Sequence, residues 1–536
     1  MSGLFGVASS ALKANQQALA TVGQNIANVN TPGYARQRIE FTTGQGAGGG
    51  VDISRIERSY SQWTTDAVRR AQQEAGAAQA QTTFLSSVES AIAPGDGGLG
   101  SAISRFQDAF SDLAAQPTVR GVRAAALEET RALAARFKAL DNQLADLEKA
   151  MRMELEGTTD RVNLLTEQLA GLNKIIQVSG VSPSIEDRQE QLLSELSFEV
   201  EIEVREGAGG QVDIFLPSGL ALIRGEERFA LSQANPGVGP FAPTLELEGS
   251  GRDPALALEK GRLGGLLSAK ENTLLPLRRE LGRLAEALAG RSNELHRQGF
   301  TAAGAAGGDL FLGANEQTDA LADPRNTGSG TVAVTVGEAD KLLPEAYFLE
   351  KSGVDLVLTR QRDGLEIFRG TEADLEATRP AGLSIEVDGA LDDGDRFSLD
   401  PLLTAAGRLE LGPQSADGLA FNRGEGSPPV SVGAADGGQA ALIGADVAVF
   451  ATGERASEAY AELVGKAGAA SRQAQAAQEV AQLSLTDATA RRENFAGVNL
   501  DEEAADLIRF QQAYQAAARI INVADTIFQT ILTAVR

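Results

Sequence analysis

The sequence predicts an α+β multidomain protein with discontinuous, nested domains. Both ends of the 536-residue chain carry apolar residues at helical spacing, helical patterns also fill the segments next to these ends, and β-type alternation is confined to the interior. We therefore expect coiled-coil-like helices at both termini, a mostly α-helical core domain with a small β unit, and a β-rich outer domain. The expected domains are 1–56 with 490–536 (terminal), 57–324 with 403–489 (helical core, containing the β unit 198–260) and 325–402 (outer).

The N-terminal segment predicts one helix from about residue 4 to 28. Lys13 is the one charged side chain in the first 35 residues. Apolar residues alternate at intervals of three and four, which places a single apolar seam along the helix. We expect this seam to be a subunit interface formed by Phe5, Leu12, Leu19, Val22, Ile26 and Val29.

A turn and a β-hairpin follow the first helix. Pro32 and Gly33 suit the central positions of a type II turn, within a motif turn that includes Asn28, Thr31 and Tyr34. Alternation from Gln37 to Phe41, a glycine-rich stretch, and a second extended segment at 51–56 predict paired strands.

The C-terminal segment predicts a helix after Asn499, which can cap it, and the acids that follow favour the positive end of the helix dipole. Two apolar lines run along this helix, so we expect it to pack against more than one neighbour. Its expected subunit-interface and chaperone-binding residues are Leu500, Leu507, Phe510, Tyr514, Ile520, Ile521, Ile527, Phe528, Ile531 and Leu532.

The interior alternates between helical and β-type segments. Helices are predicted between 57 and 200, with breaks at 94–98, near Pro117 and at 179–183. The remaining predictions are β structure at 198–260, helix at 262–298, β structure at 325–402, a weakly patterned loop at 402–440, and helices at about 450–488 and after 499.

The two end helices need partners. A lone helix of this kind is marginal in water, so we hypothesise that both ends are largely disordered in the free monomer and become ordered on assembly. The alternative is that each helix docks on its own domain. The low charge of both ends favours contacts between subunits.

Composition narrows the classes of partner. The formal net charge of −25 argues against nucleic acid, which needs a basic face. The absence of cysteine excludes disulfides and thiolate metal sites, and one histidine cannot build a multi-histidine site. With no Sec-type signal sequence and no run of about 18 apolar residues, we expect neither membrane insertion nor Sec export, so the chain is cytoplasmic unless a dedicated machine secretes it.

The sequence contains none of the common catalytic patterns. We therefore expect that the protein is not an enzyme and that it binds neither a cofactor nor a metal. His296 stands alone, and the acidic stretch from Asp388 to Asp395 lacks the ligand spacing of a calcium loop and suits a solvated turn. A secreted coiled-coil adhesin and an extracellular hydrolase remain as other classes. The single tryptophan, Trp63, argues against the aromatic platforms of a hydrolase.

The segment 25–34, NIANVNTPGY, resembles the N-terminal signature of the axial proteins of the bacterial flagellum, which form the rod, the hook and the hook-associated structures. The residues at 35–38, 497–503 and 507–516 are similar to the hook-associated members in particular. So are interior segments at 187–197, 264–267, 293–296 and 394–397.

This resemblance implies a structural subunit of the junction between hook and filament, exported by the flagellar type III apparatus and assembled at the distal end of the hook. It implies a ring of identical copies, with hook protein and the second junction protein FlgL as neighbours. The export chaperone FlgN is expected to cover the C-terminal helix. Hook or rod proteins of the same family are the runner-up.

Overall fold

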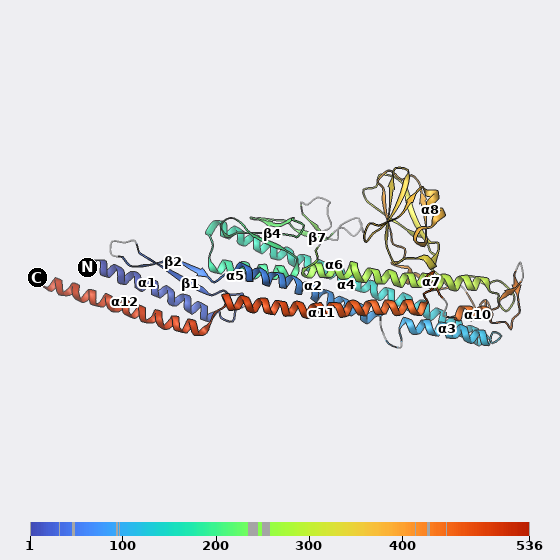
Figure 1. The fold of residues 1–536 in the computed structure, drawn as a ribbon, viewed down its shortest axis with the longest axis horizontal. Coiled ribbons are helices and arrows are strands. Elements are labelled where there is room, and N and C mark those ends of the chain that lie inside the picture. Colours follow the sequence, from blue (N-terminus) through green and yellow to red (C-terminus); the bar gives the residue numbers. More distant parts are fainter. Residues whose placement is uncertain are drawn as a thin grey trace.

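The computed structural model of the chain is an elongated molecule with both termini at one end (Figure 1). It describes residues 2–31, 33–44, 49–92, 95, 97–233, 245–248, 258–412, 414–425, 429–445 and 448–534. Long helices run along the length of the molecule, and a compact β domain projects from one side, far from the termini. The fold is α+β and multidomain, as predicted.

The helices account for most of the chain. The predicted breaks separate α2, α3, α4 and α5, and the helix predicted at 262–298 consists of α6, a π-helical turn at Lys270–Leu274, and α7. The helices are α1 (Ser2–Ala27), α2 (Gln62–Ile92), α3 (Leu99–Ala115), α4 (Arg120–Ser179), α5 (Pro183–Glu199), α6 (Gly261–Ala269), α7 (Leu275–Gln298), α8 (Glu372–Thr378), α9 (Ala405–Arg408), α10 (Gly438–Gly444), α11 (Ala456–Ala496) and α12 (Leu500–Ala534).

The turn between α4 and α5 shows why the chain reverses there. Gly180 follows the last residue of α4 with φ +76°, a conformation that glycine adopts without strain. Ser182 is extended, and Pro183 begins α5 at a position where its missing N–H costs nothing. The long helix therefore ends abruptly, and α5 packs back along it.

The helical core is held by apolar packing and by close helix contacts. Large fully buried side chains include Phe110, Phe137 and Leu133, contributed by α3 and α4. Where α2 meets α6, a Cβ atom on Gly265 would lie 2.3 Å from the carbonyl oxygen of Ala77, so only glycine fits this crossing.

The small β unit covers the C-terminal half of α4. Its strands are β3 (Glu203–Glu206), β4 (Val212–Phe215), β5 (Ala221–Arg224), β6 (Glu227–Arg228), β7 (Leu231–Gln233) and β8 (Leu245–Leu247). The first four form one antiparallel sheet and the last two pair with each other. Asn173 of α4 donates to the carbonyl oxygens of Val212 and Gly225, which fixes the sheet against the helix.

The outer domain contains two antiparallel sheets that enclose a small core around Tyr347, Leu358 and Ile385. One sheet has the order β11-β17-β13-β14-β15 and the other β10-β12-β16. The strands are β10 (Thr318–Asp319), β11 (Leu321–Ala322), β12 (Thr331–Val336), β13 (Tyr347–Ser352), β14 (Asp355–Arg360), β15 (Glu366–Gly370), β16 (Leu383–Asp388) and β17 (Arg396–Leu399).

Helix α7 holds both connections to this domain. Arg279 pairs with the carboxylate of Asp400 at 2.9 Å, just after β17. Glu286 accepts the backbone N–H of Asn315 at 2.8 Å, just before β10, and burial raises the pKa of Glu286 to about 7. The outer domain is thus anchored to the core at its entry and its exit.

The expectation of a loop at 402–440 is wrong in part. This segment contains α9 and the short strands β18 (Glu410–Leu411), β19 (Gly424–Glu425) and β20 (Val430–Ser431), and β18 pairs with β9 (Phe311–Leu312). Leu419 and Phe421 of this segment are fully buried in the helical core. The sequence did not predict this packing, because the buried residues of the segment recur with neither a helical nor a strand period.

We predict that Gly265→Ala lowers the melting temperature of the full chain. The added methyl group would force α2 and α6 apart, a change that costs about 1–3 kcal/mol in packed interiors. Gly157→Ala on α4 is the control, since a Cβ atom there meets nothing within 4 Å. It should leave stability unchanged or raise it, because alanine favours helix by about 1 kcal/mol. Equal melting temperatures for the two variants would contradict the close crossing.

Candidate functional site

The terminal helices α1 and α12 pair with each other in antiparallel orientation. Helix α12 packs along α1 and makes no comparable contact with the core helices in the described part of the chain. The paired face of α1 buries mostly small side chains: Ala8, Ala14, Ala18, Thr21 and Val22. Among the described side chains of α12, only Glu503 and Ala517 are buried. The pair therefore covers little apolar area by itself.

The residues predicted to form the N-terminal seam lie mainly on the flank of α1. Of these, Val22 is buried between α1 and α12, whereas Phe5 is 52% exposed. Leu12, Leu19 and Ile26 are half-buried along the edge of the paired face, and Val29 lies half-buried in the turn after the helix. The largest apolar side chains of α1 thus remain accessible.

The C-terminal residues divide between two faces of α12. Leu507, Phe510, Tyr514 and Ile521 are half-buried toward α1. Leu500, Ile520, Ile527 and Phe528 are exposed. The side chains of Ile531 and Leu532 lie outside the described residues. The helix thus carries an inner apolar line and an uncovered outer one.

The motif turn after α1 leads into the hairpin of β1 (Gln37–Thr43) and β2 (Val51–Arg58), which was predicted from its alternation. Gly33 has φ +84°, and the N–H of Tyr34 donates to the carbonyl oxygen of Thr31 at 3.2 Å, as a type II turn requires. Asn28 donates its side-chain N–H to the carbonyl oxygen of Gln24. Pro32 lies outside the described residues.

Asn25 connects the helix, the turn and the strand. Its amide oxygen accepts the N–H of Gln37 at 3.0 Å and the hydroxyl of Tyr34 at 2.9 Å. Its amide nitrogen donates to the carbonyl oxygen of Gln37 and to the carboxylate of Glu503. Burial raises the pKa of Tyr34 to about 12, so its hydroxyl stays protonated and can donate. All hydrogen-bonding positions of this buried amide are therefore used.

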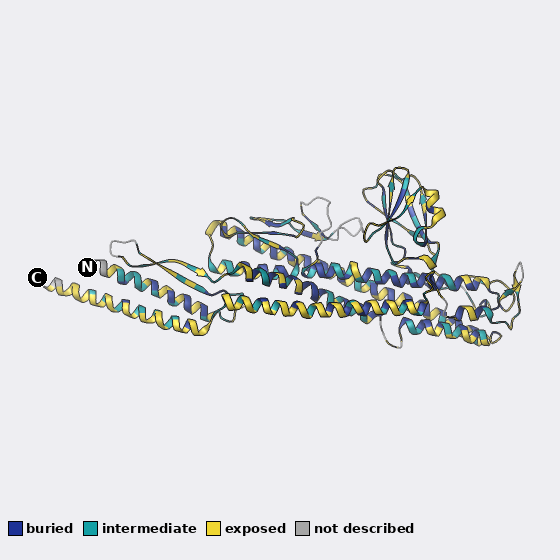
Figure 2. Ribbon diagram, in the orientation of Figure 1, coloured by how far each residue is buried: buried dark blue, intermediate teal, exposed yellow. Residues whose placement is uncertain are grey.

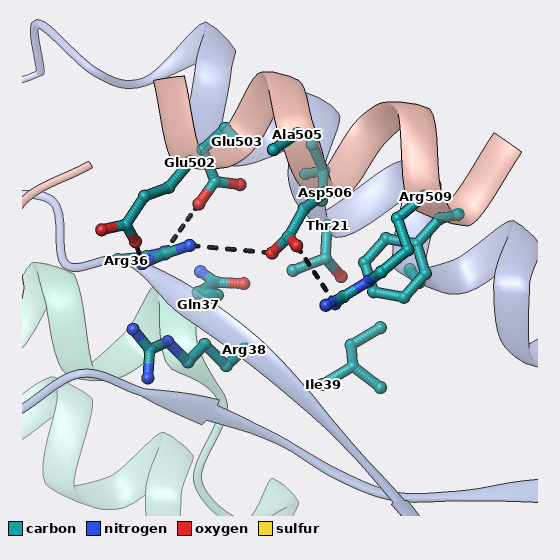
Figure 3. A pocket seen from close by; sticks show the side chains of 13 residues that line it. Thr21, Arg36, Gln37, Arg38, Ile39, Glu502, Glu503, Ala505, Asp506 and Arg509 are labelled. Carbon is teal, nitrogen blue, oxygen red and sulfur yellow. Dashed lines mark hydrogen bonds and ion pairs between the residues drawn. The ribbon is translucent and has the colours of Figure 1, made fainter. Parts of the chain in front are cut away.

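Arg36 ties the start of β1 to the first turns of α12 (Figure 3). Its guanidinium contacts the carboxylate of Glu502, lies 2.6 Å from that of Glu503 and 3.7 Å from that of Asp506. The arginine and Glu503 are both buried. These side chains line an open cleft of about 440 Å³ between α1, β1 and α12, with Thr21 and Phe510 on its walls.

The same segment is also attached to the core. The N–H of Arg36 donates to the carbonyl oxygen of Ala496 at the end of α11, and its own carbonyl oxygen accepts the N–H of Ser59. Asp187 on α5 pairs with Arg58 at the end of β2, at 3.1 Å. We call residues Asn25, Tyr34, Arg36, Arg58 and Asp187, with Glu502 and Glu503, the joint.

Sequence patterns marked the motif turn but not the contacts of the joint. Arg36 and Asp187 stood within the segments that resemble axial proteins, and Glu503 was interpreted as a helix-dipole acid. Nothing in a linear sequence shows that charges 466 residues apart, Arg36 and Glu502, meet. The one signal at the sequence level was the run of three acids, 501–503, at the start of an apolar helix.

The groups considered for chemistry have structural contacts. His296 is buried, with Nδ1 2.6 Å from the carbonyl oxygen of Gly308 and Nε2 accepting the N–H of Ala420. Burial lowers its pKa, so the ring is neutral at pH 7. Asp395 accepts backbone N–H groups of Thr327, Gly328 and Asp392. In the described part of the chain, no helix is long and apolar enough to cross a bilayer, and no cluster of metal-ligand type occurs.

Comparison with protein families gives one match at each end and one in the core. Residues 5–34 match the flagella basal body rod protein family, and residues 493–534 match the C-terminal region of the flagellar basal body rod FlgEFG proteins. Residues 85–311 match the helical domain of flagellar hook-associated protein FlgK. The terminal matches coincide with α1 and α12, and the core match covers the interior helices.

Curated relatives match along their whole length. Flagellar hook-associated protein 1 of Escherichia coli K12 is 27% identical over 99% of this chain and 100% of its own. The Bacillus subtilis protein of the same name is 24% identical over 97% of this chain and 96% of its own. The structure of the flagellar hook junction protein FlgK from Burkholderia pseudomallei shares the fold, with a TM-score of 0.71 and 19% identity over 80% of this chain and 99% of that one.

The end-to-end match to curated hook-associated proteins and the specific match of the core agree with each other. The chain is therefore a homologue of flagellar hook-associated protein 1 over its whole length, and its core matches the FlgK helical domain.

Proposed function

We propose that this chain is a structural subunit of the bacterial flagellum that forms the junction between hook and filament. The observation that carries the proposal is the pair of terminal helices, which hold each other through small residues and leave larger apolar residues uncovered. Leu500, Ile520 and Ile527 on α12 and Phe5 on α1 are the clearest examples. Such surfaces need partners, and copies of a tube-forming chain supply them.

Assembly completes the terminal helices. The buried face of α1 contains alanines rather than leucines, so the apolar area buried by the pair alone is small. We infer that residues 1–56 and 490–536 are largely disordered in the free monomer and are ordered by neighbouring copies. Disorder of this kind suits a chain exported unfolded through the flagellar type III apparatus and assembled at the distal end of the hook.

The partners follow from the same surfaces. The ring of copies contacts hook protein on one side and the second junction protein FlgL on the other. Before export, the two apolar lines of α12 suit a groove on the chaperone FlgN, which would bind the helix as an amphipathic ligand. Occupation of α12 by a chaperone and by neighbouring copies is mutually exclusive, so the chaperone prevents early assembly.

The runner-up is a rod or hook subunit. It is favoured by the family matches at residues 5–34 and 493–534, which describe basal body rod proteins. The core match at 85–311 and the full-length relatives favour the hook-associated role instead.

The joint couples the terminal helices to the core. Arg36 contacts α12 through its side chain and α11 through its backbone, and Arg58 of β2 pairs with Asp187 on α5. Movement of the core relative to the tube must therefore strain charge pairs and hydrogen bonds that include buried groups. A subunit between a curved hook and a straight filament needs such a restrained connection.

Deletion of the gene in its own host tests the function. We expect cells with hooks but no filaments, with flagellin shed into the medium, as seen by electron microscopy and immunoblotting. Cells without hooks would assign the chain to the hook or rod instead. Restoration by the full chain, but not by a chain lacking both terminal helices, would support the role of α1 and α12.

Hydrogen exchange tests ordering on assembly. In the purified monomer we expect rapid amide exchange at 5–28 and 505–532, and slow exchange in α2 and α4. The same terminal peptides should be protected in isolated flagella. Strong protection of both ends in the monomer would exclude the disorder that we propose.

Arg36→Ala tests the joint. Removing the arginine leaves the carboxylate of Glu503 buried without its partner, a loss that typically costs about 3–5 kcal/mol. We expect fewer filaments and, in isolated flagella, faster proteolysis after residue 496 in the variant. Arg55→Ala is the control, because Arg55 pairs with Glu40 and Glu57 on the exposed surface of the hairpin, where such pairs contribute about 0–1 kcal/mol. An effect of equal size in both variants would contradict the role of Arg36.

A further inference from the structure

Two core helices carry apolar lines that nothing in the described part of the chain covers. On α4, residues seven apart form the α4 line, Gly157, Leu164, Gly171 and Val178, with Ile175 beside it. Leu164 is 48% exposed and Val178 is 80% exposed. On α11, residues seven apart form the α11 line, Ala469, Ala476, Leu483 and Ala490, with Val480 beside it. Val480 is 68% and Leu483 70% exposed.

The glycines of α4 are the second observation. A Cβ atom on Gly157 or Gly171 would meet nothing within 4 Å, so packing inside the chain does not require glycine there. Glycine inside a helix nevertheless costs about 0.5–1 kcal/mol relative to alanine. A glycine that repeats on one exposed face of a helix is explained if a second helix approaches its backbone closely.

The buried face of α11, opposite the α11 line, packs closely through small residues. Ala467, Ala474, Ala481 and Ala488, again seven apart, are buried. Ala481 and Ala488 pack directly against α2. The α11 line lies on the opposite side of the helix, facing away from α2. Helix α11 therefore packs mainly on α2, with smaller contacts to α7 and α3, while the α11 line on its other side stays exposed.

The two lines lie on different sides of the molecule and match each other. Helix α2 packs against α11 on one side and against α4, α5 and α6 on the other. Each line spans the same number of residues, about 32 Å of helix. Both helices run toward the joint and end near it (Figure 1), so copies related by rotation about the long axis would present α11 and α4 in parallel.

In that parallel alignment, large side chains face small ones. Leu483 lies opposite Gly171, Leu164 opposite Ala476, and Val178 opposite Ala490. A contact between two different faces is heterologous and closes into a ring when the rotation permits. Exposed residues also continue from α11 onto α12 along the same side of the molecule (Figure 2), so the α11 line extends the surface that we assign to subunit contacts.

We propose that the α11 line of one copy docks on the α4 line of the next copy in the ring. The inference rests on the proposed function for the presence of neighbouring copies, and it adds a specific core contact outside the terminal tube. The net charge of −25 opposes association of copies in general. The apolar residues of the two lines supply the attraction that opposes this repulsion, and the positions between them are polar: Gln473 and Asp487 on α11, and Arg161 and Gln168 on α4.

Cysteine cross-linking in assembled flagella tests the contact, because the chain has no cysteine of its own. Disulfides need Cα atoms about 4.4–6.8 Å apart. We expect the double variant Gly171→Cys with Leu483→Cys, in the full chain, to form a ladder of disulfide-linked multimers on oxidation, with loss of the monomer band. Each single variant should stay monomeric, and Gly171→Cys with Thr83→Cys on α2 is the matched control.

Gly171→Leu gives an independent readout. The side chain has open space in the single chain, so the melting temperature of the purified variant should not fall, whereas its incorporation into flagella should be lost. Gly121→Leu, on the same helix but off the α4 line and equally open, should incorporate normally.

The outcomes separate the two proposals. Protein found at the junction without cross-links in the Gly171→Cys, Leu483→Cys double variant, and with normal incorporation of Gly171→Leu, would overturn this contact and leave the proposed function intact. Dimers formed by single cysteine variants would also overturn it, because they would show a symmetric contact. Absence of the unmodified chain from the junction would overturn the proposed function itself.

Discussion

The pairing of α1 with α12 is the constraint that orders the two ends of the structure and their connection to the core. It brings the two ends of a long chain to the same end of the molecule. The other domains are therefore all formed by the segment between α1 and α12, which leaves this helix pair and returns to it. The pairing is weak in apolar area, since its buried face consists largely of alanine. Its specificity comes from polar contacts at one end, where Asn25 and Arg36 meet Glu503.

The contrast between weak apolar packing along the helices and specific polar contacts at one end explains the residues found in the joint. A buried carboxylate such as Glu503 is costly without a partner, so the register of α12 against α1 is fixed wherever Arg36 is present. Alanine-lined contacts, both here and between α2 and α11, allow helices to approach closely with few interlocking side chains.

Much of the fold follows from local patterns. The breaks before α3, α4 and α5 were predicted from proline and glycine, and the β1–β2 hairpin from alternation, because these signals act over a few residues. The prediction for 402–440 was wrong in part because Leu419 and Phe421 are buried without any period. The joint was not predicted either: its pairs link residues hundreds of positions apart, and their meeting depends on how α5 and α12 are placed by the whole fold.

The seam residues show how far a heptad pattern can be taken. Phe5, Leu12, Leu19 and Ile26 were identified by spacing, yet the structure pairs α1 through the neighbouring line of small residues. Spacing shows that a helix has an apolar line but not which partner covers it. The same holds for α4 and α11, where the internal contacts are known and each helix still has an uncovered line. The apolar lines left exposed after the fold is complete, and the open glycines of α4, fit the close contact between copies that we propose.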